Sequence, residues 1–182
     1  MRLFTALDLP ADVAGNLEDL LRRLRPAARI HWSPTGNLHI TTKFIGEWPE
    51  ARLEELKLAL AGIPSRDAIP VAVRLLGFFP NTRAPRTFWC GIDAPRLPSL
   101  AADTNQAAAA LGIARETRPF SPHLTLARIK DRVPLDALNQ AVADLPSLEF
   151  GRFRAGSFFL YLSQLRPSGS VYTKLAEFPL SR

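Results

Sequence analysis

Two short segments of this sequence carry a histidine followed two positions later by a threonine. The segments are His39-Ile40-Thr41-Thr42 and His123-Leu124-Thr125-Leu126, and the chain has only one further histidine. Histidine can act as acid or base near neutral pH, because its ordinary pKa is about 6.5. Two such side chains on opposite sides of one reacting atom can carry out a displacement, in which one removes a proton from the attacking group and the other protonates the leaving group.

A phosphodiester suits such a pair, because attack and departure at phosphorus are in line. The hydroxyls of Thr41 and Thr125, together with nearby cations, could hold the non-bridging oxygens and stabilise the developing charge. One His-x-Thr segment alone is weak evidence, since a lone strand histidine is usually structural. The second copy strengthens the functional interpretation. His31 has Ser33 at the position of the threonine, and we predict a structural role for it.

Each motif lies in a run that alternates polar and apolar residues, which is the pattern of a strand buried on one face. Histidine and threonine then point the same way, and the predicted core residues are Leu38, Ile40, Leu124 and Leu126. The first histidine strand is predicted over residues 38–45. We expect the two strands to be equivalent elements of two half-domains that face one cleft.

The remaining sequence mixes helices and strands in both halves, as judged from apolar spacing and from Gly and Pro stop signals. The predicted helices cover residues 11–25, 50–61, 99–111 and 135–145. The predicted strands cover residues 3–7, 30–32, 38–45, 69–79, 87–92, 148–153, 157–165 and 171–178, with the second histidine strand beginning at residue 123. This order predicts an α+β fold with an internal pseudo-repeat. Residues 1–182 contain no low-complexity linker, so we expect one two-lobed domain.

Composition limits the functional classes. Apolar residues make up 47% of the chain and charged residues 22%, which excludes a disordered protein. The 23 Lys and Arg outnumber the 17 Asp and Glu, giving a formal charge of +6 that suits a polyanionic partner or simply a basic soluble protein. Cys90 is the only cysteine, so an intrachain disulfide is excluded. We predict that it is a small core residue.

The sequence lacks the motifs that are typical of several other kinds of chemistry. There is no His-Glu-x-x-His, paired-cysteine motif or dense carboxylate cluster, so no metal site is expected. No Gly-x-Gly-x-x-Gly or Walker-type loop is present, which argues against an ATP-driven ligase. Asp8 and Pro10 come too early for a signal peptide, and no segment reaches 18 uncharged apolar residues, so we expect a cytoplasmic protein without a membrane partner.

The two motifs resemble the signature of the 2H phosphoesterase superfamily. The wider chain resembles its bacterial RNA 2′,3′-cyclic phosphodiesterase branch, also called the 2′-5′ RNA ligases. The resemblance covers nearly the full length and lies in residues 2–10, 37–47, 86–92, 118–128 and 169–172. It implies the two-lobed 2H phosphoesterase fold, with two pseudo-symmetric antiparallel sheets and flanking helices around a central cleft.

This resemblance implies a hydrolase that needs neither metal nor cofactor. It would open the 2′,3′-cyclic phosphate at an RNA 3′ end and leave a 2′-phosphate. Ligation, if it occurs, would be the ATP-independent reversal of this reaction, with an RNA 5′-hydroxyl in place of water. The implied partner is RNA with a cyclic phosphate end, tRNA fragments included, and the implied state is a monomer.

The resemblance also implies individual roles. His123 would be the proton acceptor that activates water, and His39 the proton donor to the departing 3′ oxygen; the residues alone leave this assignment open. Thr41 and Thr125 would bind the phosphate, and Arg128 would be a further phosphate contact.

Strict alternation conflicts with one of these roles. It places Lys43 on the face of His39 but Arg128 on the face opposite His123. Arg128 reaches the phosphate only if its strand ends or bulges at Ala127. Lys43 is therefore a second candidate cation, although a lysine at a strand end is most often solvated.

Two further interpretations stay open. One is a non-catalytic module that binds RNA ends or nucleotides in the same cleft. The other is a 2H phosphodiesterase for 2′-5′ oligonucleotides or small cyclic nucleotides. The three tryptophans, Trp89 among them, are predicted to pack in the core or at the rim, whereas Phe79 or Tyr172 near a cleft mouth could stack a nucleobase.

Overall fold

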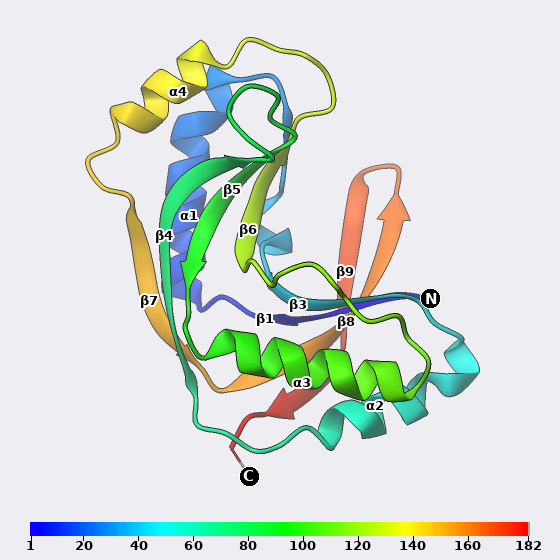
Figure 1. Ribbon diagram of the computed structural model, residues 1–182. Coiled ribbons are helices and arrows are strands. Elements are labelled where there is room, and N and C mark those ends of the chain that lie inside the picture. Colours follow the sequence, from blue (N-terminus) through cyan, green and yellow to red (C-terminus); the bar gives the residue numbers. More distant parts are fainter. Residues whose placement is uncertain (182) are drawn as a thin grey trace.

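Two antiparallel sheets form the framework of the computed structural model, which describes residues 1–181 (Figure 1). The first sheet has the strand order β3-β1-β8-β9 and the second the order β2-β6-β5-β4-β7. The strands are β1 (Arg2–Leu7), β2 (His31–Trp32), β3 (Ile40–Glu47), β4 (Ile69–Phe79), β5 (Thr87–Asp93), β6 (His123–Arg128), β7 (Glu149–Ala155), β8 (Ser157–Arg166) and β9 (Gly169–Pro179). This architecture confirms the predicted α+β class.

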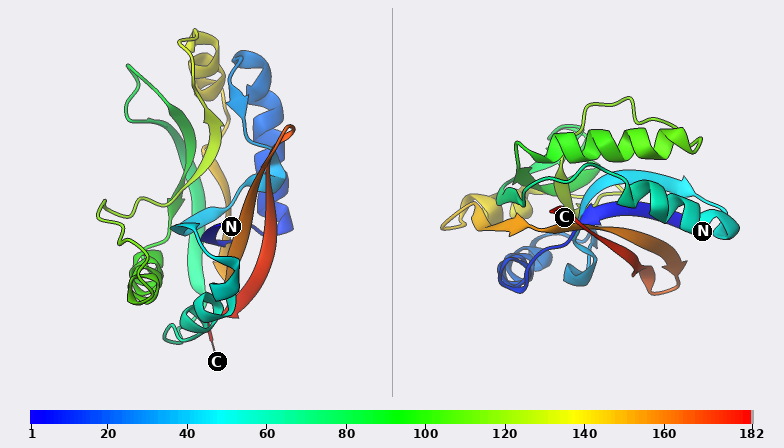
Figure 2. Two further views of the ribbon diagram at one scale, coloured as in Figure 1. Left: turned by 90° about the vertical axis from the view of Figure 1, so that its right-hand side faces the viewer. Right: turned by 90° about the horizontal axis from the view of Figure 1, so that it is seen from below.

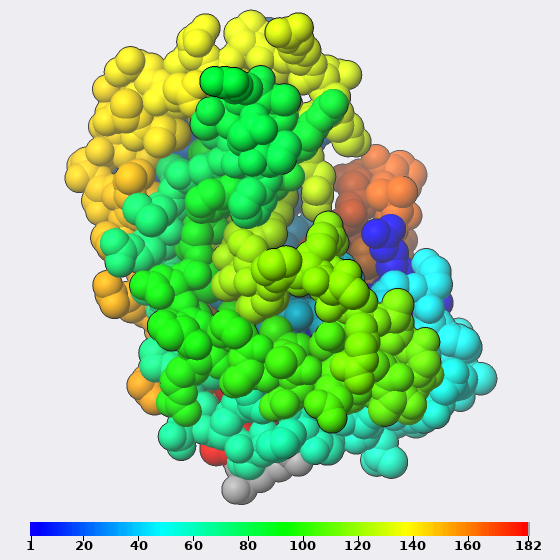
Figure 3. Space-filling view, viewed as in Figure 1, coloured from blue at the N-terminus to red at the C-terminus, as the bar shows by residue number. Residues whose placement is uncertain are grey.

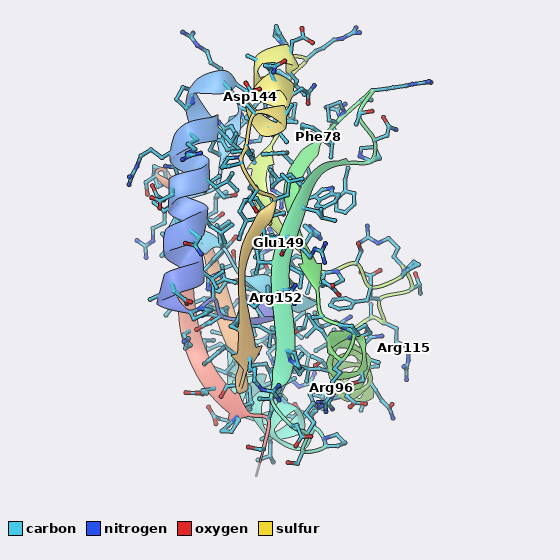
Figure 4. The ribbon with its side chains drawn as sticks, turned by 90° about the vertical axis from the view of Figure 1, so that its left-hand side faces the viewer. Phe78, Arg96, Arg115, Asp144, Glu149 and Arg152 are labelled. Carbon is cyan, nitrogen blue, oxygen red and sulfur yellow. The ribbon has the colours of Figure 1, made fainter. Side chains whose placement is uncertain are left out.

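Four α-helices flank the sheets. They are α1 (Ala11–Leu24), α2 (Leu53–Ala61), α3 (Leu97–Ala110) and α4 (Asp136–Ala143). Figure 4 shows α1 and α4 on one side of β4 and β7, and α3 with Arg115 of the following loop on the other side. The longest, α1 and α3, have 14 residues each, and within residues 1–181 no helix is both long and apolar enough to cross a membrane.

The helices interlock the two sheets. Helix α1 follows β1 of the first sheet but packs against β7 of the second. Helix α3 follows β5 of the second sheet but packs against β3 of the first. Each sheet also takes strands from both halves of the chain, so the two lobes do not correspond to the two halves of the sequence.

One apolar cluster extends through both lobes. It includes Leu7 of β1, Leu17 of α1, Phe88 of β5, Leu124 of β6 and Phe158 of β8, all of which are almost completely buried. Unfolding either lobe would expose part of this shared cluster to water. We therefore propose that both sheets belong to one two-lobed domain.

The predicted strands and helices are present, with one difference that affects the site. The first histidine strand begins at Ile40 and not at residue 38. A 3₁₀ helix (Thr35–Asn37) precedes it, and the backbone N–H of Leu38 donates to the carbonyl of Thr35. That N–H is unavailable for a strand partner, so His39 lies just outside β3. The predicted core residues of both motifs are buried, as expected: Leu38, Ile40, Leu124 and Leu126.

The shared core leads to a stability prediction. Leu17 of α1 is completely buried, so Leu17→Ala should lower the free energy of unfolding by about 2–5 kcal/mol through lost burial and a residual cavity. Leu58 of α2 is 77% exposed, and Leu58→Ala should change the same quantity by less than about 0.5 kcal/mol. Urea denaturation of both variants measures the difference. Equal losses in the two variants would contradict this account of the core.

Candidate active site

His39 is held by the turn that leads into β3. Its Nδ1 lies 3.1 Å from the carbonyl oxygen of Asn37, and its side chain is only 12% exposed. A carbonyl oxygen can only accept a hydrogen bond, so the hydrogen of the neutral ring lies on Nδ1. Nε2 is then the atom that can take up or release a proton.

His123 is held in the same way on the second sheet. It is the first residue of β6, and its Nδ1 lies 2.8 Å from the carbonyl oxygen of Ser121. In both motifs the acceptor is the carbonyl two residues before the histidine. The two imidazoles therefore share one tautomer, and each keeps Nε2 for chemistry.

The chain between the sheets brings the two motifs together. Ser33 donates from its hydroxyl to the carbonyl of Thr125 and from its backbone N–H to the carbonyl of Leu126, both at 2.8 Å. Six residues later the same segment reaches His39. Strands β3 and β6 also approach each other directly, with Cα atoms within 8 Å.

A long hairpin flanks the first motif. Strands β8 and β9 extend beyond the rest of the first sheet (Figures 1 and 2), and Asn37 Nδ2 donates to the carbonyl of Ser170 at the hairpin end over 2.8 Å. The surface is hollowed between this hairpin and β6 (Figure 3). His39 lies on the hairpin side of the structure, with its ring centroid 5.8 Å from that of Tyr172.

A bulge in β3 changes which residues face the site. Thr41 pairs with Ala6 and Lys43 with Thr5, which leaves Thr42 as an extra residue. The bulge turns Lys43 to the face opposite Thr41, because pairing alternates from residue to residue. Lys43 is 6% exposed and donates to the carbonyl of Ala114 over 2.7 Å. The prediction that Lys43 shares the face of His39 is therefore wrong.

A matching bulge in β6 has the opposite consequence for Arg128. Thr125 pairs with Trp89 and Ala127 with Phe88, so Leu126 is the extra residue. Arg128 then pairs with Thr87, on the same face of the second sheet as Thr125. The predicted phosphate contact of Arg128 needs a strand end or a bulge at Ala127, and the bulge lies one residue earlier, at Leu126.

The first motif has a neighbouring carboxylate that the sequence analysis did not identify. Asp8, directly after β1, has its Oδ1 3.8 Å from His39 Nε2. Lys174 Nζ donates to Asp8 Oδ2 over 2.6 Å, and the hydroxyl of Tyr161 donates to Oδ1. No spacing rule connects positions 8, 161 and 174. Only the pairing of β1 with β8 and of β8 with β9 brings them together.

These contacts affect protonation at the first motif. Burial lowers the pKa of His39 below its ordinary value, the bond to Asn37 and the charge of Asp8 oppose that shift, and Lys174 adds to it. Burial and then the bond to Asp8 raise the pKa of Tyr161. At the second motif, the ring of His123 lies 5.1 Å from that of Phe79 in an edge-to-face arrangement.

The remaining candidate residues are placed as follows. Cys90 is completely buried, and burial raises the pKa of its thiol to about 12, which confirms the predicted core role. His31 is exposed on β2, where its strand partner is Arg128. In the described part of the chain, no three His, Cys, Asp or Glu side chains are grouped so that they could hold a metal ion.

Proteins with one His-x-Thr motif on each of two antiparallel sheets form the class of 2H phosphoesterases, and the arrangement above places the chain in that class. The family model described as LigT like Phosphoesterase matches residues 7–89 and 92–172. The chain belongs to this LigT-like family.

Relatives cover nearly the whole chain. An RNA 2′,3′-cyclic phosphodiesterase of Methanocaldococcus jannaschii is 32% identical over 97% of this chain and 99% of its own length. That of Thermus thermophilus is 34% identical over 99% and 90%. Among solved structures, TT0787 of Thermus thermophilus has a TM-score of 0.82 at 31% identity, covering 99% of this chain and 98% of its own. The LigT of E. coli complexed with 3'-AMP has a TM-score of 0.79 at 27% identity, covering 100% and 98%.

The contacts of His39 predict how its protonation responds to substitution. Asp8→Asn removes the negative charge beside Nε2, so the pKa of His39 should fall further. Lys174→Met removes a nearby cation and should raise the pKa of His39. NMR titration of the imidazole resonances measures both shifts. Asp144→Asn on the distant end of α4 is the matched control, and an equal shift in that variant would contradict the local effect.

Proposed function

We propose that this protein hydrolyses the 2′,3′-cyclic phosphate at RNA 3′ ends to a 2′-phosphomonoester, by paired histidine acid and base catalysis. The observation that carries the proposal is the pair of imidazoles, one from each sheet, whose Nδ1 atoms are both engaged and whose Nε2 atoms are both available. The relatives from M. jannaschii and T. thermophilus, named RNA 2′,3′-cyclic phosphodiesterases, support this substrate class.

The proposed reaction is a single displacement at phosphorus. Nε2 of His123 accepts a proton from a water molecule as the water oxygen attacks the cyclic phosphate. The bond from phosphorus to the 3′ oxygen breaks, and His39 gives its Nε2 proton to that oxygen. The products are a 2′-phosphate and a 3′-hydroxyl, with the two histidines left in exchanged protonation states.

One contact of His39 supports its role as the proton donor. Burial lowers the pKa of His39, and Asp8 near Nε2 opposes that shift by favouring the charged imidazolium that a proton donor must be before the reaction. A bound phosphodiester anion would add a second negative charge that favours the same form. The ring of His123 packs edge-to-face against that of Phe79, with the centroids 5.1 Å apart.

The phosphate contacts follow from the same strands. Thr41 and Thr125 share a face with their histidines, so their hydroxyls can donate to the non-bridging oxygens. Arg128 lies on the face of Thr125 and supplies the cation for the charge that develops there.

The finer aspects of the function are also proposals. The net charge of +6 favours RNA ends over small uncharged substrates, and tRNA fragments carry such ends. We propose that the protein acts on them as a cytoplasmic monomer. Ligation would use an RNA 5′-hydroxyl in place of water and needs no ATP. A phosphodiesterase for 2′-5′ oligonucleotides or small cyclic nucleotides uses the same residues and is the second candidate function.

The two histidines provide the direct test of catalysis. His39→Ala and His123→Ala should each lower kcat by a factor of about 10² to 10⁴, the range for loss of one general acid or base. The assay is hydrolysis of a short RNA with a 2′,3′-cyclic phosphate end, in EDTA and without ATP, with the position of the phosphate in the product identified. Binding of this RNA without turnover by the unsubstituted protein would instead indicate a binding module, and a 3′-phosphate product would reverse the identity of the leaving oxygen.

The bulge in β6 provides a second test. Arg128→Gln should lower kcat/KM for the same RNA by about 10- to 100-fold, because it removes a charged hydrogen bond to the phosphate. Arg96→Gln removes an equal charge at the exposed start of α3 and should leave kcat/KM within a factor of about two of the unsubstituted protein. If both variants lose activity equally, only the total charge matters and the contact is absent.

A further inference from the structure

Positive charge gathers at one end of the second sheet, outside the site described above. Residues 80–87 join β4 to β5 and carry two arginines and no acid, whereas residues 128–134 continue from the end of β6 and carry three cations and one acid. Together these two segments have a net charge of +4, against +6 for the whole chain. Figures 1 and 2 show both segments at the end of the second sheet that points away from α3. Most of the net charge of the protein thus lies in one small region.

The cations of this region are not neutralised by neighbouring acids. Arg83, Arg86, Lys130 and Arg132 are all exposed, and in the described part of the chain none of them forms an ion pair with a carboxylate. Several other arginines of this protein do form such pairs, Arg66 among them. A phosphate can therefore approach these four side chains without displacing an ionic partner.

Hydrogen bonds hold the two segments in place. Oδ1 of Asn81 accepts from the backbone N–H groups of Arg83 and of the next residue, at 2.9 and 3.0 Å, which closes the tip of the loop. Nη1 of Arg86 donates to the carbonyl of Lys130 over 3.2 Å, and the backbone N–H of Ile129 donates to the carbonyl of Arg86. The loop is thus joined to the segment after β6, and the guanidinium of Arg86 has further N–H groups that can donate to a phosphate.

The region continues directly from the proposed phosphate contacts. Arg128 pairs with Thr87 on one side and with His31 of β2 on the other, so these three side chains share one face of the sheet. His31 is exposed there, and its imidazole can donate to a phosphate. Lys130 follows His123 by seven positions, which places it about 20 Å further along the extended chain.

We propose that His31, Arg83, Arg86, Lys130 and Arg132 form a basic surface that binds the phosphates of the RNA chain several nucleotides before its cyclic end. The inference rests on the proposed function and specifies the length of RNA that the protein recognises. A stacked strand carries one phosphate about every 3.4 Å, so a surface about 20 Å from the second motif meets roughly the sixth phosphate from the end. A mononucleotide cannot reach it. The surface includes His31, for which the sequence predicted a structural role.

The composition of the basic surface favours RNA over an anionic lipid surface. Proteins that bind at a membrane surface insert apolar side chains beside their cations. Among the described residues, the large apolar side chains that are exposed all lie outside residues 80–87 and 128–134; they are Phe44, Leu58, Leu75, Leu148, Leu165 and Val171. Three of the five members are arginines, whose planar set of donors matches the oxygens of a phosphodiester.

The test compares two substrates that share the cyclic end and differ in length. These are adenosine 2′,3′-cyclic phosphate and a 12-nucleotide RNA that ends in the same nucleotide. Lys130→Gln combined with Arg132→Gln removes two exposed cations whose side chains make no hydrogen bond within the described residues, so the fold should be unaffected. This double variant should raise KM for the RNA about 10-fold, because two phosphate contacts are lost. Its kcat for the RNA, and both constants for the mononucleotide, should stay unchanged.

Salt dependence and a charge-matched control sharpen the comparison. In the double variant, the slope of log KM for the RNA against log salt concentration should become smaller by about 1.4, since each contact with a single strand contributes about 0.7. Arg152→Gln combined with Arg154→Gln removes the same charge from β7, at the opposite edge of the second sheet (Figure 4), and should preserve KM and its slope. An equal rise of KM in both double variants would overturn the basic surface and leave the proposed function intact. An unchanged KM in the Lys130 and Arg132 variant would do the same.

Binding without turnover separates failure of the basic surface from failure of the proposed function. If the unsubstituted protein hydrolyses neither substrate, the proposed function is wrong. Fluorescence anisotropy of the same RNA with a 3′-hydroxyl end then measures affinity for the RNA chain alone. A loss of about 10-fold in the Lys130 and Arg132 variant, absent from the β7 control, supports the basic surface, and equal affinities overturn it. If that variant keeps its affinity for RNA and loses binding to phosphatidylserine vesicles, the surface binds lipid and the assignment to RNA is wrong.

Discussion

The proposed chemistry depends on one hydrogen bond that is made twice, from a histidine Nδ1 to the carbonyl two residues earlier. This bond fixes the tautomer of the neutral ring and leaves Nε2 as the atom that is free to exchange a proton in both motifs. Its acceptors lie in the segments just before β3 and β6, so the turns matter as much as the strands. At the first motif, Asn37 also uses its side chain to hold Ser170 of the β8–β9 hairpin. The orientation of His39 is therefore coupled to the position of the hairpin.

The interlocked sheets explain how two distant motifs share one site. The segment before the first motif is bound to the backbone of the second through Ser33, and Lys43 of β3 is bound to Ala114, in the loop that leads to the second. A displacement at phosphorus needs the acid and the base to be held at fixed positions relative to the reacting atoms. Connections on both sides of the site, together with helices exchanged between the lobes, restrict relative motion of the two histidines.

The sequence predicted the elements well because their causes are local. Apolar spacing identified α1, and the alternation around Thr41 and Thr125 identified the faces of both motifs. The bulges were not predictable, because an extra residue in a strand is defined by its partner strand, which the sequence does not reveal. For this reason alone, the predicted sheet face of Lys43 was wrong and that of Arg128 was uncertain. The contact between Asp8 and His39 could not be predicted from the sequence, since it requires the pairing of strands from opposite ends of the chain.

The two bulges also show how a repeated backbone produces an asymmetric site. Each bulge falls on the residue after the threonine, so Phe44 in β3 corresponds to Arg128 in β6. Phe44 pairs with Phe4, and its side chain is 65% exposed on the sheet face that carries Tyr161. The same geometry thus presents a cation on the face of the second motif and an aromatic ring on the face of the first. In the proposed mechanism one histidine acts as acid and the other as base, which requires different surroundings, and the bulges allow these surroundings to diverge without altering the positions of the histidines.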